Sequence, residues 1–168
     1  MMRELKTTII VLLFTSLLLL VGVVNVTGEA YESMKGIHSV KAVFDMRAGS
    51  PKSAALLLNL IHQTHRDKQL TEITDKPAFK VVFIGPSVKL ISTNRDGFSP
   101  EDHKFLDEIA GTVSQMSKDG IRLEICLFAA KVFGVAPASV LPEIKQVPNG
   151  WVSLIAYQAK GFTLVPVY

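Results

Sequence analysis

Cysteine is almost absent from this sequence: Cys126 is the only one among 168 residues. A single cysteine excludes an intramolecular disulfide, so the folded chain must depend on its hydrophobic core for stability. In an exported protein, a lone cysteine indicates intermolecular pairing, a free thiol with a chemical purpose, or a thiol buried beyond reach. The chain also has no internal repeat and no low-complexity tract.

A concentration of charge of one sign is also missing. The chain has 18 Lys and Arg against 15 Asp and Glu, a net charge of +3, and its basic residues are scattered. Because nucleic-acid binding requires a concentrated basic face, we exclude nucleic acid as a partner. The segment Gly85-Pro86-Ser87 lacks the repeated glycines and the Gly-Lys-Ser/Thr of a phosphate-binding loop, so the sequence gives little support for nucleotide binding.

The N-terminal part predicts export. Residues 9–24 are almost entirely apolar and follow a short segment that carries Arg3 and Lys6. This order is typical of a secretory signal, and an uncleaved membrane anchor is the alternative. We therefore expect a signal peptide or anchor at residues 1–28, a polar linker at 29–38 and a single domain at 39–168. The predicted location is the periplasm, with membrane contact only if the N-terminal segment is retained.

The domain alternates between strand-like and helix-like segments. Val40–Met46 and the apolar run Lys80–Gly85 have the composition of buried strands, and a third strand ends at Cys126. Ser99-Pro100-Glu101-Asp102 is a helix start with features of a capping box. We expect helices at residues 51–66, 87–91, 100–119 and 127–134, and a brief helical turn between residues 137 and 142.

The C-terminal part predicts two further strands, Trp151–Gln158 and Phe162–Val167. The connection between them is too short for a parallel crossover, so we expect an antiparallel pair. Together these segments predict a three-layer α/β domain with a mainly parallel sheet.

Cys126 is the main candidate for chemistry. It lies where a predicted strand meets a predicted helix, and ligands of α/β sheets bind at the carboxyl ends of strands. The start of a helix favours a thiolate. Apolar neighbours such as Ile125 and Phe128 oppose ionisation, however, and free cysteines are frequently inert core residues. From the residues alone, both interpretations stay open.

Other residues are candidates for a pocket beside this thiol. Gly85-Pro86-Ser87 ends a strand, and Lys89 and Lys131 could add positive charge; the alternative is that both are ordinary surface lysines. Asn59 interrupts an apolar helix face. Its favoured role is structural, tying the helix to a strand-end loop, and ligand contact is the second. The candidate pocket set is therefore Asn59, Gly85, Pro86, Ser87, Lys89 and Lys131.

A metal site is not expected. His62 and His65 are three residues apart on a predicted helix, but no cysteine or acid lies nearby at ligand spacing. We interpret the two histidines as solvated helix surface.

Several blocks of the chain resemble the DsrE/DsrF-like family, which includes sulfur-relay subunits and YchN-like proteins. The matching blocks span residues 40–168. They are L-L-L-N-L-I around Asn59, V-V-F-I-G-P-S-V-K-L, K-D-G-I-R-L-E-I-C-L-F-A-A-K-V-F-G-V around Cys126, L-P-E-I-K-Q-V-P-N-G-W-V, and Y-Q-A-K-G-F-T-L-V-P.

The resemblance implies a flavodoxin-like domain that assembles into homo- or hetero-oligomers. It also implies that Cys126 accepts sulfane sulfur from a donor, holds it as a persulfide and passes it to an acceptor protein, with no metal or cofactor. The export signal would place such a sulfur-handling protein in the cell envelope. The alternative is a non-catalytic oligomeric binding or scaffold module with an inert cysteine.

Overall fold

The structure, a computed structural model, describes residues 31–74 and 76–168. The predicted signal peptide or anchor at residues 1–28 lies outside them. In the rest of the predicted linker, Glu32–Met34 form a short 3-10 turn, η1. Residues 36–168 make up the folded unit described below. None of the described helices combines the length and the hydropathy needed to span a bilayer.

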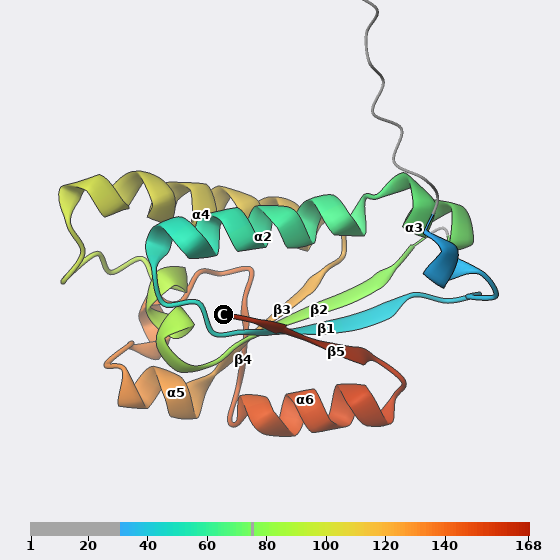
Figure 1. Ribbon diagram of the computed structural model, residues 1–168. Helices are drawn as coiled ribbons and strands as arrows, with labels where there is room; N and C mark the ends of the chain where they lie inside the picture. The colour runs from blue at the N-terminus through green and yellow to red at the C-terminus, as the bar shows by residue number, and fades with distance from the viewer. Residues whose placement is uncertain (1–30, 75) are drawn as a thin grey trace, which may run out of the picture. The chain divides into compact units, whose positions relative to one another are not determined.

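Five parallel strands form one sheet in the order β4-β3-β2-β1-β5 (Figure 1). The strands are β1 Lys41–Met46, β2 Ala78–Phe83, β3 Arg122–Cys126, β4 Lys145–Val147 and β5 Thr163–Val167. The three inner strands are buried along most of their length, as their apolar sequences predict. The predicted α/β architecture with a mainly parallel sheet is therefore confirmed.

Helices cover both faces of the sheet. α2 (Pro51–His65) and α4 (Pro100–Lys118) lie above it in Figure 1, whereas α5 (Leu127–Val132) and α6 (Gly150–Ala159) lie below. Shorter elements connect them: α3 (Lys68–Ile73), η2 (Gly85–Ile91) and η3 (Pro137–Ser139). The chain thus forms the expected three layers.

The start of α4 illustrates how local sequence sets an element boundary. The Ser99 hydroxyl accepts a hydrogen bond from the Asp102 backbone N–H, and the Asp102 carboxylate accepts from the Ser99 backbone N–H. Pro100 occupies the first helical position, where its missing N–H costs nothing. This reciprocal arrangement is the predicted capping box.

The predicted antiparallel C-terminal pair is wrong. Residues 150–159 form helix α6 instead of a strand, and β5 pairs in parallel with β1. Trp151, Val152 and Ile155 favour strands by propensity, but the Asn149 side chain caps a helix by accepting from the Trp151 N–H. Because β4 and β5 lie at opposite edges, the chain needs a crossover between them, and α6 supplies it.

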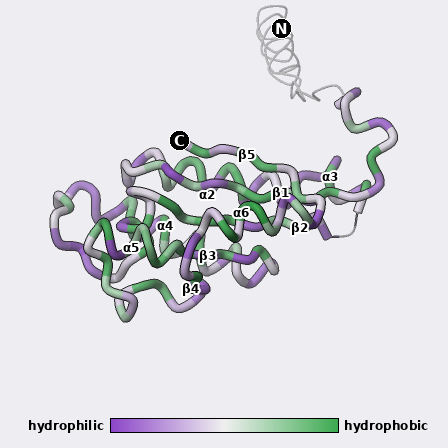
Figure 2. Tube along the Cα trace, turned by 90° about the horizontal axis from the view of Figure 1, so that it is seen from below, coloured by the Kyte–Doolittle hydropathy of each residue, from purple (hydrophilic) through white to green (hydrophobic). Residues whose placement is uncertain are grey.

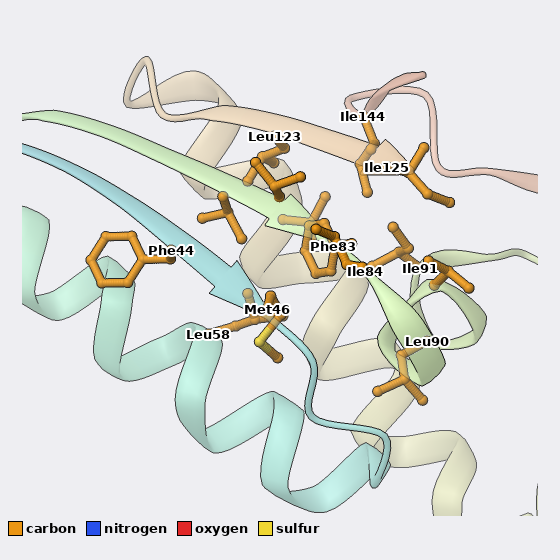
Figure 3. Packing of buried hydrophobic residues seen from close by; sticks show 14 of the residues in the cluster. Phe44, Met46, Leu58, Phe83, Ile84, Leu90, Ile91, Leu123, Ile125 and Ile144 are labelled. Atoms are coloured by element: carbon orange, nitrogen blue, oxygen red, sulfur yellow. The ribbon is translucent and has the colours of Figure 1, made fainter. Parts of the chain in front are cut away.

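The main core lies between the sheet and the α2–α4 layer. In β1, Phe44 and Met46 point toward α2, which carries Leu58 (Figure 3). Register places Met46 beside Phe83, and Phe83 beside Ile125, in neighbouring strands. Because strand side chains alternate between faces, the residues that follow these three point toward the α5–α6 layer.

The edge strand β5 carries a proline at its free side. Val167 accepts a hydrogen bond from the Arg47 N–H, so its polar backbone groups face β1. Successive residues in a strand direct these groups to opposite sides, and the nitrogen of Pro166 therefore lies on the open edge.

A partly buried polar contact fixes α6 against the sheet. The Tyr157 hydroxyl donates a hydrogen bond to Glu124 Oε1 of β3 at 2.8 Å, and the Arg122 Nε donates to the same oxygen at 2.7 Å. Burial raises the pKa of Glu124, but these hydrogen bonds outweigh it and bring the pKa below its usual value. Burial and the Glu124 contact raise the pKa of Tyr157 to about 12.

We expect Tyr157→Phe to lower the free energy of unfolding at neutral pH by about 1–2 kcal/mol, because Glu124 loses a hydrogen bond. The Tyr157 pKa in the folded protein lies above its unfolded value, so its contribution is complete below pH 10 and declines as the pH rises toward about 12. Urea unfolding at several pH values should show the gap between wild type and variant narrowing above pH 10. If the difference in free energy of unfolding between wild type and variant stays constant above pH 10, the hydrogen bond from Tyr157 to Glu124 is not its source.

Candidate functional site

Arg47, Ile84 and Cys126 form a row across the carboxyl ends of β1, β2 and β3. Each residue follows one member of the register-matched set Met46, Phe83 and Ile125. The Ile84 N–H donates to the Met46 carbonyl at 3.0 Å, so the strand pairing continues to this level. The row faces the α5–α6 layer, at the edge of the sheet where α/β proteins bind ligands.

Cys126 is both the last residue of β3 and the N-cap of α5. Its Sγ accepts a hydrogen bond from the Ala129 backbone N–H at 3.4 Å, as a capping side chain does. The residue is only 3% exposed, and its thiol is free. A hydrogen bond to sulfur from a helix N–H stabilises negative charge there.

A cavity of about 340 Å³ opens over this row. Its inner wall includes Ile84, Gly85 and Cys126, and Arg47 and Asn149 contribute polar groups. The remaining lining comes from α5 and the start of α6: Phe128, Ala129, Val132, Phe133 and Trp151. The volume is at the lower end of the range for small-molecule sites, and the walls are mostly apolar.

The mouth of the cavity carries exposed apolar side chains. Phe128 and Val132 of α5 are 69% and 65% exposed, and Trp151 of α6 is 60% exposed. Val152 and Ile155 extend this surface along α6. Figure 2 views the layer that contains both helices, and hydrophobic stretches lie on each of them. Exposed apolar groups that gather in one place mark a binding surface.

Close packing at Gly150 brings α6 against the thiol. A Cβ atom at this position would lie 2.9 Å from two Ile84 side-chain carbons and 3.0 Å from the Cys126 Cβ. A glycine at position 150 therefore allows the start of α6 to reach the strand ends. Asn149 and Gly150 together form one side of the site.

The DsrE/DsrF-like family model matches residues 40–167. The chain belongs to the DsrE/DsrF-like family. This family is associated with sulfur relay, and the match confirms the resemblance seen in the sequence blocks.

One curated relative of this DsrE/DsrF-like chain illustrates the level of similarity. An uncharacterized protein of Aquifex aeolicus is 29% identical over 131 residues, which is 76% of this chain. The aligned part is 56% of that relative, so the chain spans about half its length.

Two solved structures align with this chain. A protein of unknown function from Methanobacterium thermoautotrophicum, MTH1491, aligns with a TM-score of 0.59 and 17% identity, covering 76% of this chain and 99% of its own. The ychN protein of E. coli aligns with a TM-score of 0.49 and 11% identity, covering 77% of this chain and 100% of its own.

The structure brings together only part of the predicted pocket set. Gly85 lines the cavity with Cys126. Its neighbour Pro86 is exposed and packs against Gly49. Ser87 is fully buried, and its hydroxyl donates to the Met46 carbonyl at 2.7 Å. Ser87 therefore ties the ends of β1 and β2 together and does not face the cavity.

The remaining predicted residues lie outside the cavity. Asn59 is exposed on α2, where its Oδ1 accepts a hydrogen bond from the Gln63 side chain of the same helix, so the predicted tie between this helix and a strand-end loop is wrong. Lys89 lines a separate small pocket and stacks on Phe98, with its Nζ 5.4 Å from the ring centre. Lys131 is exposed on α5 and is not part of the cavity wall.

The two histidines of α2 have different partners. The His62 Nε2 lies 2.7 Å from Asp119 Oδ2, whereas the His65 Nε2 contacts the Pro77 carbonyl at 3.0 Å. Burial lowers the pKa of His65 below its ordinary value. No group of three or more His, Cys, Asp or Glu residues within 31–74 and 76–168 is arranged to hold a metal ion.

Three residues of the site, Arg47, Asn149 and Trp151, are not among the residues predicted from the sequence. Arg47 directly follows β1, and Cys126 is the last residue of β3. Placing the carboxyl ends of the predicted strands side by side would have identified Arg47 as a neighbour of the thiol. Asn149 and Trp151 could not be placed while residues 151–158 were interpreted as a strand.

We expect Gly150→Ala to destabilise the protein by about 1–3 kcal/mol, because the added methyl group overlaps Ile84 and Cys126. Gly111→Ala is the matched control, since Gly111 is an exposed residue in the middle of α4 with no atom within 4 Å of an added Cβ. This control should gain up to about 1 kcal/mol from helix propensity. Urea unfolding measures the free energy of unfolding of both variants. Equal changes in Gly150→Ala and Gly111→Ala would contradict the close packing of α6 on the thiol.

Proposed function

We propose that this protein is a sulfur-handling protein of the cell envelope that carries sulfane sulfur as a persulfide on Cys126. The observation that supports the proposal most directly is the position of the chain's only cysteine in the wall of a cavity at the carboxyl ends of the strands. Membership of a family associated with sulfur relay supports it independently.

The chemistry requires only a thiolate and a donor of sulfane sulfur. With thiosulfate as donor, the Cys126 thiolate attacks the outer sulfur atom, the S–S bond of thiosulfate breaks, and sulfite leaves with the bonding electrons. The product, Cys–S–S⁻, carries one added sulfur. An acceptor thiolate then attacks the terminal sulfur, regenerating the Cys126 thiolate. The Ala129 N–H that donates to Sγ would stabilise the charge on the thiolate.

One observation favours the alternative, a binding or scaffold module with an inert thiol. Cys126 is 3% exposed and belongs to the hydrophobic core cluster. In the sulfur-carrier hypothesis, a small donor enters through the cavity, and contact with bulk solvent is not required. In the scaffold hypothesis, the same burial keeps the thiol unreactive.

The proposed location follows from the N-terminal sequence. Residues 9–24 are apolar after Arg3 and Lys6, the order typical of a segment that directs export. We include the periplasmic side of the membrane in the proposal, with residues 1–28 acting as a cleaved signal or a retained anchor. A sulfur carrier there would meet donors and acceptors different from those of the cytoplasm.

Incubation of the purified protein with thiosulfate or polysulfide should add one sulfur, about 32 Da, as expected for a single persulfide. Intact-mass spectrometry measures the gain, and dithiothreitol should reverse it. Cys126→Ser should show no gain. If the wild-type mass is unchanged, and the thiol reacts with a labelling reagent only after unfolding, the carrier function is wrong and the scaffold alternative is favoured.

Assembly is part of the proposal, since family members act in sulfur-relay complexes. We propose that the apolar surface formed by Phe128, Val132, Trp151, Val152 and Ile155 is covered in a homo- or hetero-oligomer. These side chains are exposed at the mouth of the cavity, so a subunit bound here would bring its own groups next to Cys126.

For the homo-oligomer, Ile155→Glu should lower the molar mass measured by light scattering, because a buried unpaired charge opposes association. Leu56→Glu is the matched control: Leu56 is a similarly exposed apolar residue on α2, in the other helix layer. Loss of assembly in the control alone would place the interface on α2. A wild-type protein that is already monomeric would contradict self-association.

A further inference from the structure

Arg47 is the only residue with a formal charge among the described residues that line the cavity. It belongs to the same row as Cys126, with Ile84 between them. Neighbouring parallel strands lie about 4.8 Å apart, so the backbones of Arg47 and Cys126 are about 10 Å apart. A long arginine side chain spans much of that separation. Because the other walls are mostly apolar, Arg47 is the main source of positive potential among the described residues that line the cavity.

Asp45 holds the arginine side chain in place. The Arg47 Nε donates to Asp45 Oδ2 at 2.8 Å, and the Asp45 side chain is only 9% exposed. This contact uses one N–H of the guanidinium, whereas the four N–H groups on its two terminal nitrogens make no hydrogen bond among the described residues. A guanidinium held at Nε therefore presents a fixed pair of donors, the geometry that recognises oxyanions in bidentate fashion.

The Asp45 charge reduces the effect of Arg47 but does not reverse it. Asp45 is not part of the cavity wall, whereas Arg47 is, so the positive end of the pair faces the cavity. The Arg47 side chain is 32% exposed, which leaves it accessible to a ligand. A partly offset positive charge suits reversible binding of a small anion that must be released.

Asn149 adds a neutral donor on the other side of the cavity. Its Oδ1 accepts from the Trp151 N–H at 2.9 Å, which orients the side chain. The Nδ2 amino group makes no hydrogen bond in the described part of the chain. The polar donors of the cavity therefore come from Arg47 and Asn149, and both suit an anionic ligand.

We propose that Arg47 is the anion-recognition residue of the Cys126 cavity and restricts its ligands to small anions that carry a polarisable sulfur, such as thiosulfate or a polysulfide. The assignment of sulfur compounds rests on the proposed function; the preference for anions rests on Arg47 itself. The apolar walls suit the sulfur end of such a molecule, and the guanidinium binds its charged end.

The chain provides an internal probe of the cavity, because Trp151 is its only tryptophan and lines the site. The experiment compares quenching of Trp151 fluorescence by iodide, an anion, with quenching by neutral acrylamide at constant ionic strength. Removal of one nearby positive charge in Arg47→Gln should lower the iodide quenching constant about two- to threefold and leave the acrylamide constant unchanged. Arg47→Lys keeps the charge and should remain near the wild type.

Two further variants control for other effects. Lys131→Gln removes the same charge from an exposed position on α5 that does not line the cavity, and both quenching constants should be unchanged. If Arg47→Gln alone fails to fold, the double variant Asp45→Asn with Arg47→Gln replaces it. The double variant removes both partners of the ion pair, so no unpaired carboxylate is left buried. The double variant should also lose the excess iodide quenching.

Equal iodide quenching in wild type, Arg47→Gln and Lys131→Gln would overturn the proposal. A parallel change in iodide and acrylamide quenching would also overturn it, because Arg47 would then maintain the shape of the cavity and not its selectivity. Since neither result depends on thiol chemistry, the test holds even if Cys126 never accepts sulfur.

A second measurement connects anion selectivity to the thiol. The rates of Cys126 alkylation by negatively charged iodoacetate and by neutral iodoacetamide are compared in the same variants. The iodoacetate-to-iodoacetamide ratio should fall about two- to threefold in Arg47→Gln. An unchanged ratio would overturn the role of Arg47 near the thiol, whereas failure of both reagents to react would count against the carrier function alone.

Discussion

The crossing of α6 from one edge of the sheet to the other is the constraint on which the site depends. β4 and β5 lie at opposite edges, and the chain between them must pass over β3, β2 and β1. The start of the helix is pressed against the strand ends because Gly150 has no side chain, and its body is fixed to β3 through Tyr157. Without this crossing, Cys126 would lie on an open sheet face and not in a cavity.

Parallel register determines which chemical groups meet beneath the crossing. Three residues from distant parts of the sequence, Arg47, Ile84 and Cys126, reach the same level because β1, β2 and β3 are paired without a bulge. The row combines a cation, an apolar spacer and a thiol. A shift of one residue in any pairing would turn one of these side chains to the other face, so chemical function and strand register are inseparable here.

Much of the fold could be predicted from local sequence, whereas much of the site could not. Buried strands such as 80–85 and the capped helix that begins at Pro100 carry strong local patterns, and Cys126 was placed correctly at a strand–helix junction. Residues 151–158 have a β-branched and aromatic composition that predicts a strand, but this composition says nothing about sheet order. Arg47 and Asn149 were missed for the same reason, since they are brought to Cys126 only by pairing and crossover. Lys89 and Lys131 are near Cys126 in the sequence or the expected fold, but neither residue lines its cavity.

The two ends of the sheet have a consequence for how this chain meets others. β4 has only three residues, and the proline of β5 leaves the open edge without one of its amide donors. A strand from another molecule would therefore find fewer hydrogen-bonding groups at either edge than a long edge strand without proline offers. These edges favour contacts through side chains on the helical layers, where shape and charge distinguish one surface from another, over contacts through the backbone, which is the same in every protein.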